Sequence, residues 1–259
     1  MIDPLMFIAL LPAVVLVVYI CRKDRTDKEP PALIAKLLGY GVLSCLPAIV
    51  VEFILSAIIE RLNVRNAFLG YFLEAFVVAG LTEETCKFLF LRTTWRNPAF
   101  DYQFDAIVYA VMVALGFAAF ENVKYVYSYG FATGIVRAVT AVPGHAIFGV
   151  FMGYFYGYAK LSDYWGRDDD RKAYLALSVV VPVLMHGCYD FLAFTQESDS
   201  RFTLLFYAYL VALYVFGIRR VNRSSRDDRR VTRETVFDYF RRMQYPMPPQ
   251  YRDRDDFWR

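Results

Sequence analysis

The sequence predicts an all-α protein, a bundle of about seven membrane-spanning helices. Hydrophobic residues make up 57% of its 259 residues and the mean hydropathy is +0.31, more apolar than is usual for a soluble domain. The apolar residues are concentrated in segments, and most of these have the roughly 17–25 residues that a helix needs to cross the hydrocarbon core. They cover residues 5–21, 32–59, 67–91, 106–126, 133–159, 173–194 and 202–218.

The first apolar segment, 5–21, is interpreted as a membrane anchor. A secretory signal peptide would begin with basic residues and end at a small-x-small cleavage site. This segment instead follows Asp3, and no such site precedes Arg22. We therefore count it among the spanning helices.

The basic residues of the loops predict the orientation, because Lys and Arg collect on the cytoplasmic side. The loop at 22–28 is rich in both. If it is cytoplasmic, the alternation of the segments places the N-terminus outside and the C-terminus inside. The other basic loop residues on the cytoplasmic side are then Arg92, Arg96, Lys160, Arg167, Arg171 and Lys172, against Arg61, Arg65 and Arg201 outside.

The chain divides into a membrane bundle, residues 1–218, and a basic tail, residues 219–259. The tail carries twelve Arg and seven acidic residues, a net charge of +5 that leaves the bundle at −2. We expect a solvated, partly disordered tail; the alternative is that it contacts anionic lipid headgroups of the cytoplasmic leaflet, and we expect no nucleic-acid partner. Residues 231–243 favour a short amphipathic helix, which the prolines from Pro246 onward would end.

Six of the ionisable residues within or beside the apolar segments form the candidate site. A charged group at the bilayer centre costs about 2.5–3.5 kcal/mol on insertion scales, so such residues usually face the interior of a bundle. Carboxylates together with imidazoles can activate a water molecule for hydrolysis. The predicted catalytic residues are Glu83, Glu84, Glu121, His145, His186 and Asp190.

Glu83 and Glu84 are adjacent acids in the third segment, followed by Lys87. At a spacing of four and three residues, Lys87 can reach either acid on a helix. We expect Lys87 to hold one acid and leave the other free as a general base. The alternative is that both acids extend towards the cytoplasm. Glu121 lies nearer the outer interface, where Lys124 and Tyr125 are its expected local partners.

Each histidine lies close to helix-breaking residues. His145 follows Pro143-Gly144, and His186 lies between Pro182 and Gly187, so we expect an interrupted helix beside each. Irregular backbone at membrane depth is tolerated where it is buried in protein or lines a wet cavity.

His186 and Asp190 are four residues apart, so they share a helix face. Close packing of a neighbouring helix is expected at Gly149, Gly153 and Gly157.

At these residues the chain resembles the PrsW family of intramembrane proteases, over about residues 70–195. That family is distantly similar to the CAAX prenyl endopeptidases. One departure is Ala106, where a glycine is expected. The matching features are Glu83-Glu84-x-x-Lys87, Phe104-Asp105-x-Ile107-Val108-Tyr109, Gly116-Phe117-x-x-x-Glu121-Asn122 continuing to Tyr125, His145, and His186-x-x-x-Asp190.

The resemblance implies endoproteolysis of single-pass membrane proteins in a prokaryotic plasma membrane. The family's best-known role is site-1 cleavage of membrane-anchored anti-sigma factors. Two chemistries fit the residues: a metal-free one with a glutamate as base, which we slightly favour, and zinc held by His145, His186 and one glutamate. The other functions considered are a proton-coupled transporter or channel, against which the lack of an internal repeat argues, and a non-catalytic scaffold.

Overall fold

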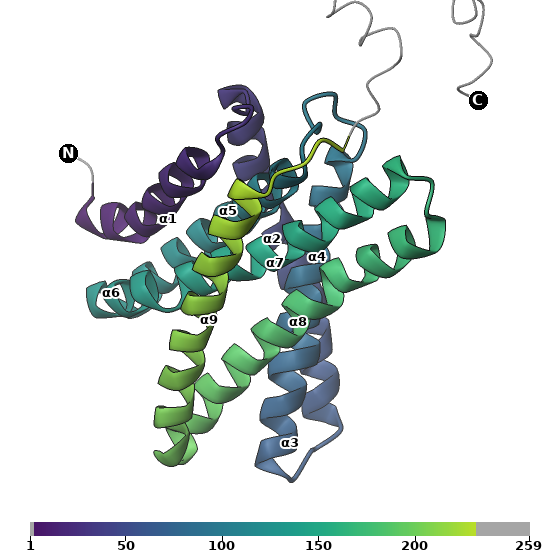
Figure 1. Ribbon diagram of the computed structural model, residues 1–259. Helices are drawn as coiled ribbons and strands as arrows, with labels where there is room; N and C mark the ends of the chain where they lie inside the picture. Colours follow the sequence, from purple (N-terminus) through teal and green to yellow (C-terminus); the bar gives the residue numbers. More distant parts are fainter. Residues whose placement is uncertain (1–2, 232–259) are drawn as a thin grey trace, which may run out of the picture.

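The computed structural model describes residues 3–231, and within them the predicted all-α fold is confirmed (Figure 1). The helix predicted at 231–243 lies almost wholly outside the described residues. Residues 3–231 also contain an isolated antiparallel β-bridge between Tyr102 and Arg230. The helices are α1 (Pro4–Lys23), α2 (Pro31–Arg61), α3 (Ala67–Phe72), η1 (Leu73–Leu81), α4 (Thr82–Leu91), η2 (Arg92–Thr94), α5 (Gln103–Tyr129), α6 (Phe131–Val139), α7 (Ala141–Tyr164), α8 (Asp168–Ser198) and α9 (Arg201–Arg226).

Six stretches of the described residues are long and apolar enough to cross a membrane: α1, α2, α5, α6 with α7, α8 and α9. The seventh segment, 67–91, is also helical, but it is divided into α3, η1 and α4. Each of these pieces is shorter than a spanning helix. The bundle is therefore a polytopic membrane fold, while the count of seven and the orientation stay predictions.

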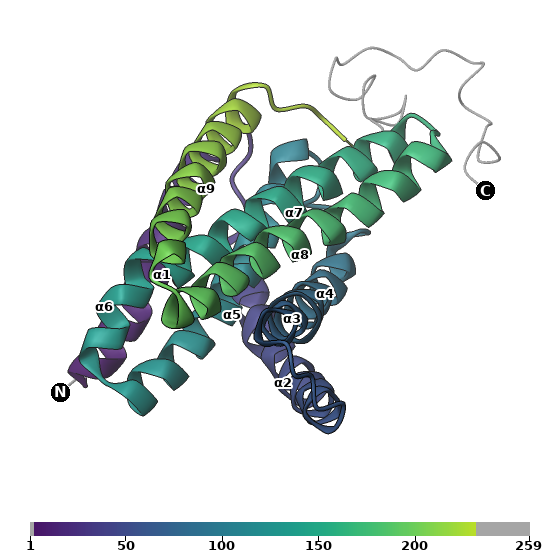
Figure 2. The ribbon, with the colours of Figure 1, turned by 90° about the horizontal axis from the view of Figure 1, so that it is seen from below.

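α5 is the central helix of the bundle. Nearly all of its residues from Phe104 to Ala118 are buried, and it packs against α1, α2 and α7. Viewed from below, α2, α3 and α4 project on one side of the molecule, and α1 and α6 lie on the other (Figure 2). α5 is thus enclosed by the other helices, which explains why its sequence is apolar on every face.

Close packing of α7 on α5 follows from the predicted glycine series. A Cβ atom added to Gly149 would lie 2.9 Å from the Cβ of Ala114, and one added to Gly157 would lie 2.7 Å from the carbonyl oxygen of Gln103. Real side chains do not approach so closely, so only glycine lets these two backbones meet. The prediction of close helix contact at this face is confirmed.

The interruptions expected beside the histidines are not found there. Pro143 lies in the first turn of α7, where a missing N–H costs nothing. The break in the segment 133–159 comes earlier, at Thr140 between α6 and α7. α8 continues through Pro182 without interruption. The irregular helix is instead η1, a π-helix that ends directly before α4, and such wide turns are frequent at functional sites.

The end of the described chain returns to the start of α5. The backbone N–H of Gln103 donates to the carbonyl of Arg229 at 2.7 Å, and that of Phe104 donates to Asp228 Oδ1 at 2.9 Å. Asp105 accepts from the N–H of Tyr102 at 2.7 Å. These bonds satisfy N–H groups at the helix start that would otherwise be unpaired.

Candidate active site

Glu83 and Glu84 lie in the first turn of α4, and both are buried. Lys87 Nζ is 3.0 Å from Glu83 Oε2 and 2.7 Å from Glu84 Oε1, and the lysine side chain is 1% exposed. The expectation that Lys87 would leave one acid free is wrong, because it contacts both. A buried ammonium needs such partners, since its desolvation costs several kcal/mol.

His145 is joined to this group through Lys87. Its Nδ1 lies 3.1 Å from Lys87 Nζ, and its Nε2 lies 3.0 Å from Glu121 Oε2. An ammonium has no acceptor, so Nδ1 must accept and the ring proton must be on Nε2. His145 is therefore neutral in this arrangement and donates to Glu121.

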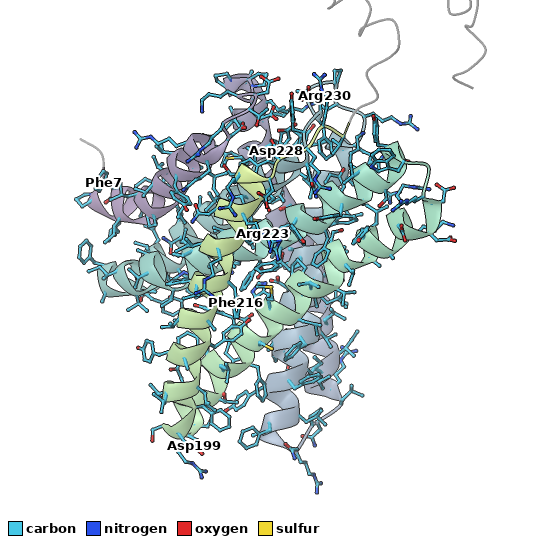
Figure 3. The ribbon with its side chains drawn as sticks, viewed as in Figure 1. Phe7, Asp199, Phe216, Arg223, Asp228 and Arg230 are labelled. Carbon is cyan, nitrogen blue, oxygen red and sulfur yellow. The ribbon has the colours of Figure 1, made fainter. Side chains whose placement is uncertain are left out.

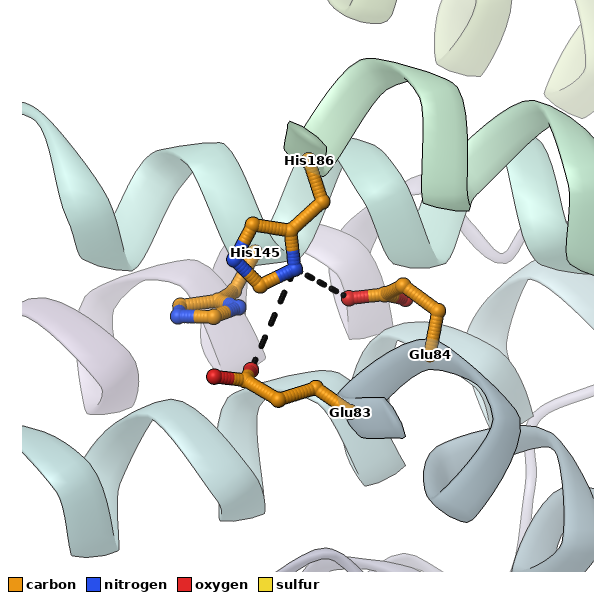
Figure 4. Close-up of side chains that lie close together, drawn as sticks. All are labelled: Glu83, Glu84, His145 and His186. Atoms are coloured by element: carbon orange, nitrogen blue, oxygen red, sulfur yellow. Dashed lines mark hydrogen bonds and ion pairs between the residues drawn. The ribbon is translucent and has the colours of Figure 1, made fainter. Parts of the chain in front are cut away.

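His186 reaches the same group from α8. Its Nδ1 lies 2.9 Å from Glu84 Oε1 and 3.9 Å from Glu83 Oε2 (Figure 4). Its Nε2 lies 3.2 Å from Asp190 Oδ2, which confirms that the two residues share a helix face. Carboxylates therefore hold the imidazole from both sides, and both nitrogens can donate at once only when the ring carries two protons.

The six predicted residues thus come together from four helices, α4, α5, α7 and α8. Their roles remain predictions. Glu121, which the sequence places nearer the outer interface, enters the cluster through its hydrogen bond with His145.

Sequence reasoning missed Arg137, the charged partner of Glu121. Arg137 Nη2 lies 2.7 Å from Glu121 Oε2, its Nε donates to Asn122 Oδ1 at 3.0 Å, and its guanidinium lies 3.9 Å from the ring centre of Tyr125. We had expected Lys124 and Tyr125 to be the local partners of Glu121. An arginine within the apolar segment 133–159 was the available signal, because such a charge needs a partner at that depth.

A cavity of about 280 Å³ opens onto the cluster. Glu83 lines it, whereas Glu84 lies behind Glu83 and is fully buried. Sequence reasoning also missed Glu52, an acid of α2 whose Oε1 has no hydrogen-bond partner among the described residues. The other polar residues that line the cavity include Ser56, Glu74, Glu121, Lys124, Tyr125, Arg137, His145, His186, Tyr189 and Asp190.

The donor set suits a divalent metal. Glu83, Glu84, His145 and His186 each offer one ligand atom, and these atoms all lie within 4.8 Å of one another. Carboxylate and imidazole are ligands that zinc takes in proteins. In each histidine the Nδ1 faces this group and the Nε2 faces a carboxylate outside it, as is usual for metal-bound histidines. The Lys87 ammonium contacts three of the four residues and would have to leave them.

Comparison with known proteins decides the family. A family described as PrsW family intramembrane metalloprotease matches residues 29–218. The chain belongs to the PrsW family.

Curated PrsW relatives align over most of this chain. The Protease PrsW of Bacillus subtilis is 34% identical over 214 residues, which is 82% of this chain and 92% of the relative. That of Oceanobacillus iheyensis is 35% identical over 215 residues, 83% and 93% of the two chains, and that of Clostridioides difficile 29% over 232 residues, 88% and 94%. No solved structure matches significantly.

Membership in the PrsW family identifies the chain as an enzyme, an intramembrane protease, and as a multi-pass membrane protein. The resemblance noted from the sequence is thereby confirmed. A PrsW-family protease is not expected to act as a transporter or a non-catalytic scaffold, so neither of these alternatives is favoured.

Proposed function

We propose that the protein cleaves a peptide bond of membrane-anchored proteins at the cluster around Glu83. The observation that carries the proposal is the unequal placement of the two adjacent acids. Glu83 lines the cavity, while Glu84 is enclosed between Lys87 and His186. One carboxylate can therefore meet a water molecule and substrate, and the other fixes the groups around it.

In this mechanism Glu83 is the general base. It takes a proton from a water molecule in the cavity while the water oxygen bonds to the peptide carbonyl carbon. In the metal-free form the carbonyl oxygen gains negative charge, which the cationic Lys87 beside Glu83 stabilises. The C–N bond then breaks as the leaving nitrogen takes the proton back from Glu83. Asp190 and Glu84 act as positioning residues that hold His186.

Glu84, His145 and His186 would hold the metal that the family description implies. Zinc bound there would supply a Lewis acid and lower the pKa of its bound water. Glu121 and Asp190 would keep the two histidine rings oriented by accepting from Nε2. Glu83 is the base with or without the metal. The convergence of the two Nδ1 atoms favours the zinc form over the metal-free form that the sequence slightly favoured.

The proposed substrates are single-pass proteins of a bacterial plasma membrane, and a membrane-anchored anti-sigma factor is the proposed example. Support comes from the bacterial origin of the PrsW relatives and from the cavity. The cavity extends from Glu83 to Glu74. Glu74 lies near the start of η1, at the end that is farther from α4. A substrate segment could enter along this path.

The test measures cleavage of a single-pass reporter, together with bound metal, in purified protein. Glu83→Gln should abolish cleavage and keep the metal, whereas His145→Ala and His186→Ala should lose both. Glu60→Gln is the matched control, because Glu60 is exposed at the end of α2 outside the cavity. Full cleavage by folded Glu83→Gln would overturn the proposal.

A further inference from the structure

A second polar cavity lies at the end of α9 that the orientation places in the cytoplasm. It measures about 190 Å³ and lies between the start of α5, the end of α7 and the end of α9. Figure 3 shows Arg223 and Asp228 near this end of α9, with Asp199 at the opposite end of the helix. The cavity lies away from the Glu83 cluster. Its polar and aromatic lining includes Gln103, Tyr154, Tyr158, Arg220, Arg223 and Arg229.

The lining residues include three arginines and one aspartate. Asp227 Oδ2 lies 3.5 Å from Arg223 Nε and compensates that arginine. Arg220 lies over the ring of Tyr154, 4.0 Å from its centre. Within residues 3–231, no carboxylate oxygen comes within 4.0 Å of the Arg220 or Arg229 side-chain nitrogens. Two positive charges thus face one cavity without an anionic partner there.

The backbone holds Arg229 at this position. The carbonyl of Arg229 accepts from the N–H of Gln103, and the neighbouring Asp228 accepts from the N–H of Phe104. The chain after α9 is therefore tied to the first turn of α5. These same bonds satisfy N–H groups at the start of α5, so the positive charge of the cavity comes from the arginines.

The cavity lies where α9 passes from its apolar segment into the basic residues that follow it. Arg220 is the second residue after the apolar segment 202–218, and Tyr154 and Tyr158 line the same cavity. Arg and Tyr gather where a spanning helix leaves the hydrocarbon. A guanidinium presents parallel N–H groups that match two phosphate oxygens, and basic pockets between cytoplasmic helix ends bind lipid headgroups.

We propose that this cavity binds the phosphate of an anionic phospholipid, held by Arg220 and Arg229. The interaction involves no covalent step and is independent of the proteolytic function. A free phosphate ion offers the same chemistry, so it is the competing source of the ligand.

The test is native mass spectrometry of the detergent-purified protein with phosphatidylglycerol or phosphatidylcholine. An arginine that contacts the lipid phosphate contributes about fivefold to affinity, so the double variant Arg220→Gln/Arg229→Gln should lose at least about tenfold of the bound phosphatidylglycerol. The double variant Arg219→Gln/Arg226→Gln removes the same charge from the same end of α9, and neither residue lines the cavity. It should lose clearly less, because neither guanidinium can hydrogen-bond to a phosphate held in the cavity.

Two further measurements identify the ligand and guard against misfolding. Inorganic phosphate at millimolar concentration should displace phosphatidylglycerol only weakly; strong, Arg220-dependent displacement would support the free ion as the ligand of the same site. Arg229→Gln alone changes an exposed side chain and should still lose about fivefold if the double variant misfolds. Equal losses in both double variants, or no preference over phosphatidylcholine, would overturn the proposal.

Discussion

Lys87 Nζ lies 3.1 Å from His145 Nδ1, although the two residues come from helices α4 and α7 and are 58 positions apart. This contact connects the acid pair to the first histidine and fixes the histidine tautomer. It also places a protein cation among the residues that suit a metal. Lys87 is therefore the residue through which the acids and the histidines of the cluster depend on one another.

Replacing Lys87 by Met should destabilise the protein. The change leaves two adjacent buried carboxylates without their cation, and breaking a buried ion pair in this way costs about 3–5 kcal/mol. The thermal unfolding midpoint in detergent measures the effect. The double variant Lys87→Met/Glu84→Gln should recover part of the loss, and an unfolding midpoint unchanged in Lys87→Met would contradict the prediction.

Replacing Arg137 by Gln should lower kcat more than it raises KM. Arg137 holds Glu121, and Glu121 accepts from His145, so its removal disturbs the histidine from a distance. Loss of such an outer partner typically costs 10–100-fold in activity or metal affinity, so a decrease on the order of 10–100-fold is expected. Arg137→Lys should restore part of it. Lys124→Gln, on the same cavity, is the control, and an equal loss there would argue against a specific role.

Metal content should separate the two glutamates. Glu84→Gln should lower bound zinc, because Glu84 is the enclosed acid beside His186, whereas Glu83→Gln should retain it. A chelator should abolish cleavage by the wild type, and added zinc should restore it. Elemental analysis of the purified variants checks this expectation. Cleavage that resists the chelator in protein free of metal would favour the metal-free mechanism.

Stability should fall as pH rises through about 6 to 7 because of two acids in the loop after α1. Burial raises the pKa of Asp24 to about 6 and that of Glu29 to about 7, from ordinary values of 3.8 and 4.5. Such acids bind protons more tightly in the folded protein than in the unfolded one. Their contribution is therefore complete below about pH 4 and lost above about pH 7.

Thermal unfolding between pH 5 and pH 8 measures this dependence. Glu29→Gln should flatten the upper part of the curve, because it removes the group with the higher pKa. Asp27→Asn, in the same loop, is the matched control, since that side chain is exposed. A midpoint that rises between pH 5 and pH 8 would contradict the assignment.

Replacing Gly149 by Ala should weaken the packing of α7 on α5. The added Cβ would lie 2.9 Å from the Cβ of Ala114, so the helices must separate, at a cost of about 1–3 kcal/mol. Gly39→Ala is the control in α2, where nothing lies within 4 Å of the added atom. That change should be neutral or stabilising, since alanine favours a helix. Equal unfolding midpoints for the two variants would refute the packing argument.

The sequence predicted site residues well where placing that residue type inside a membrane costs free energy. Acids and histidines within apolar segments identified the candidate cluster, and the spacing of His186 and Asp190 gave their contact correctly. It failed where the outcome depends on how separate helices meet. The contact of Lys87 with His145 required the relative placement of α4 and α7, whereas its contacts with both acids lie within α4.

The prolines misled for a related reason. Pro143 becomes harmless once α7 begins at Ala141, and a sequence alone does not show where a long apolar segment is divided. Arg137 was overlooked because it lies inside such a segment. The π-helix η1 leaves no simple sequence signal, since its residues are as apolar as those of an ordinary helix.

The wide turns of η1 determine how α4, the helix that follows them directly, is rotated about its own axis. An α-helix advances about 100° per residue, so deleting one residue from η1 while α3 keeps its place would shift α4 by one position. Glu84 would then take the place of Glu83 at the cavity, and Phe88 the place of Lys87. The cavity would keep a carboxylate, but the acid pair and His145 would lose the Lys87 ammonium between them. One extra residue in a helix thus determines which chemical groups the bundle presents together.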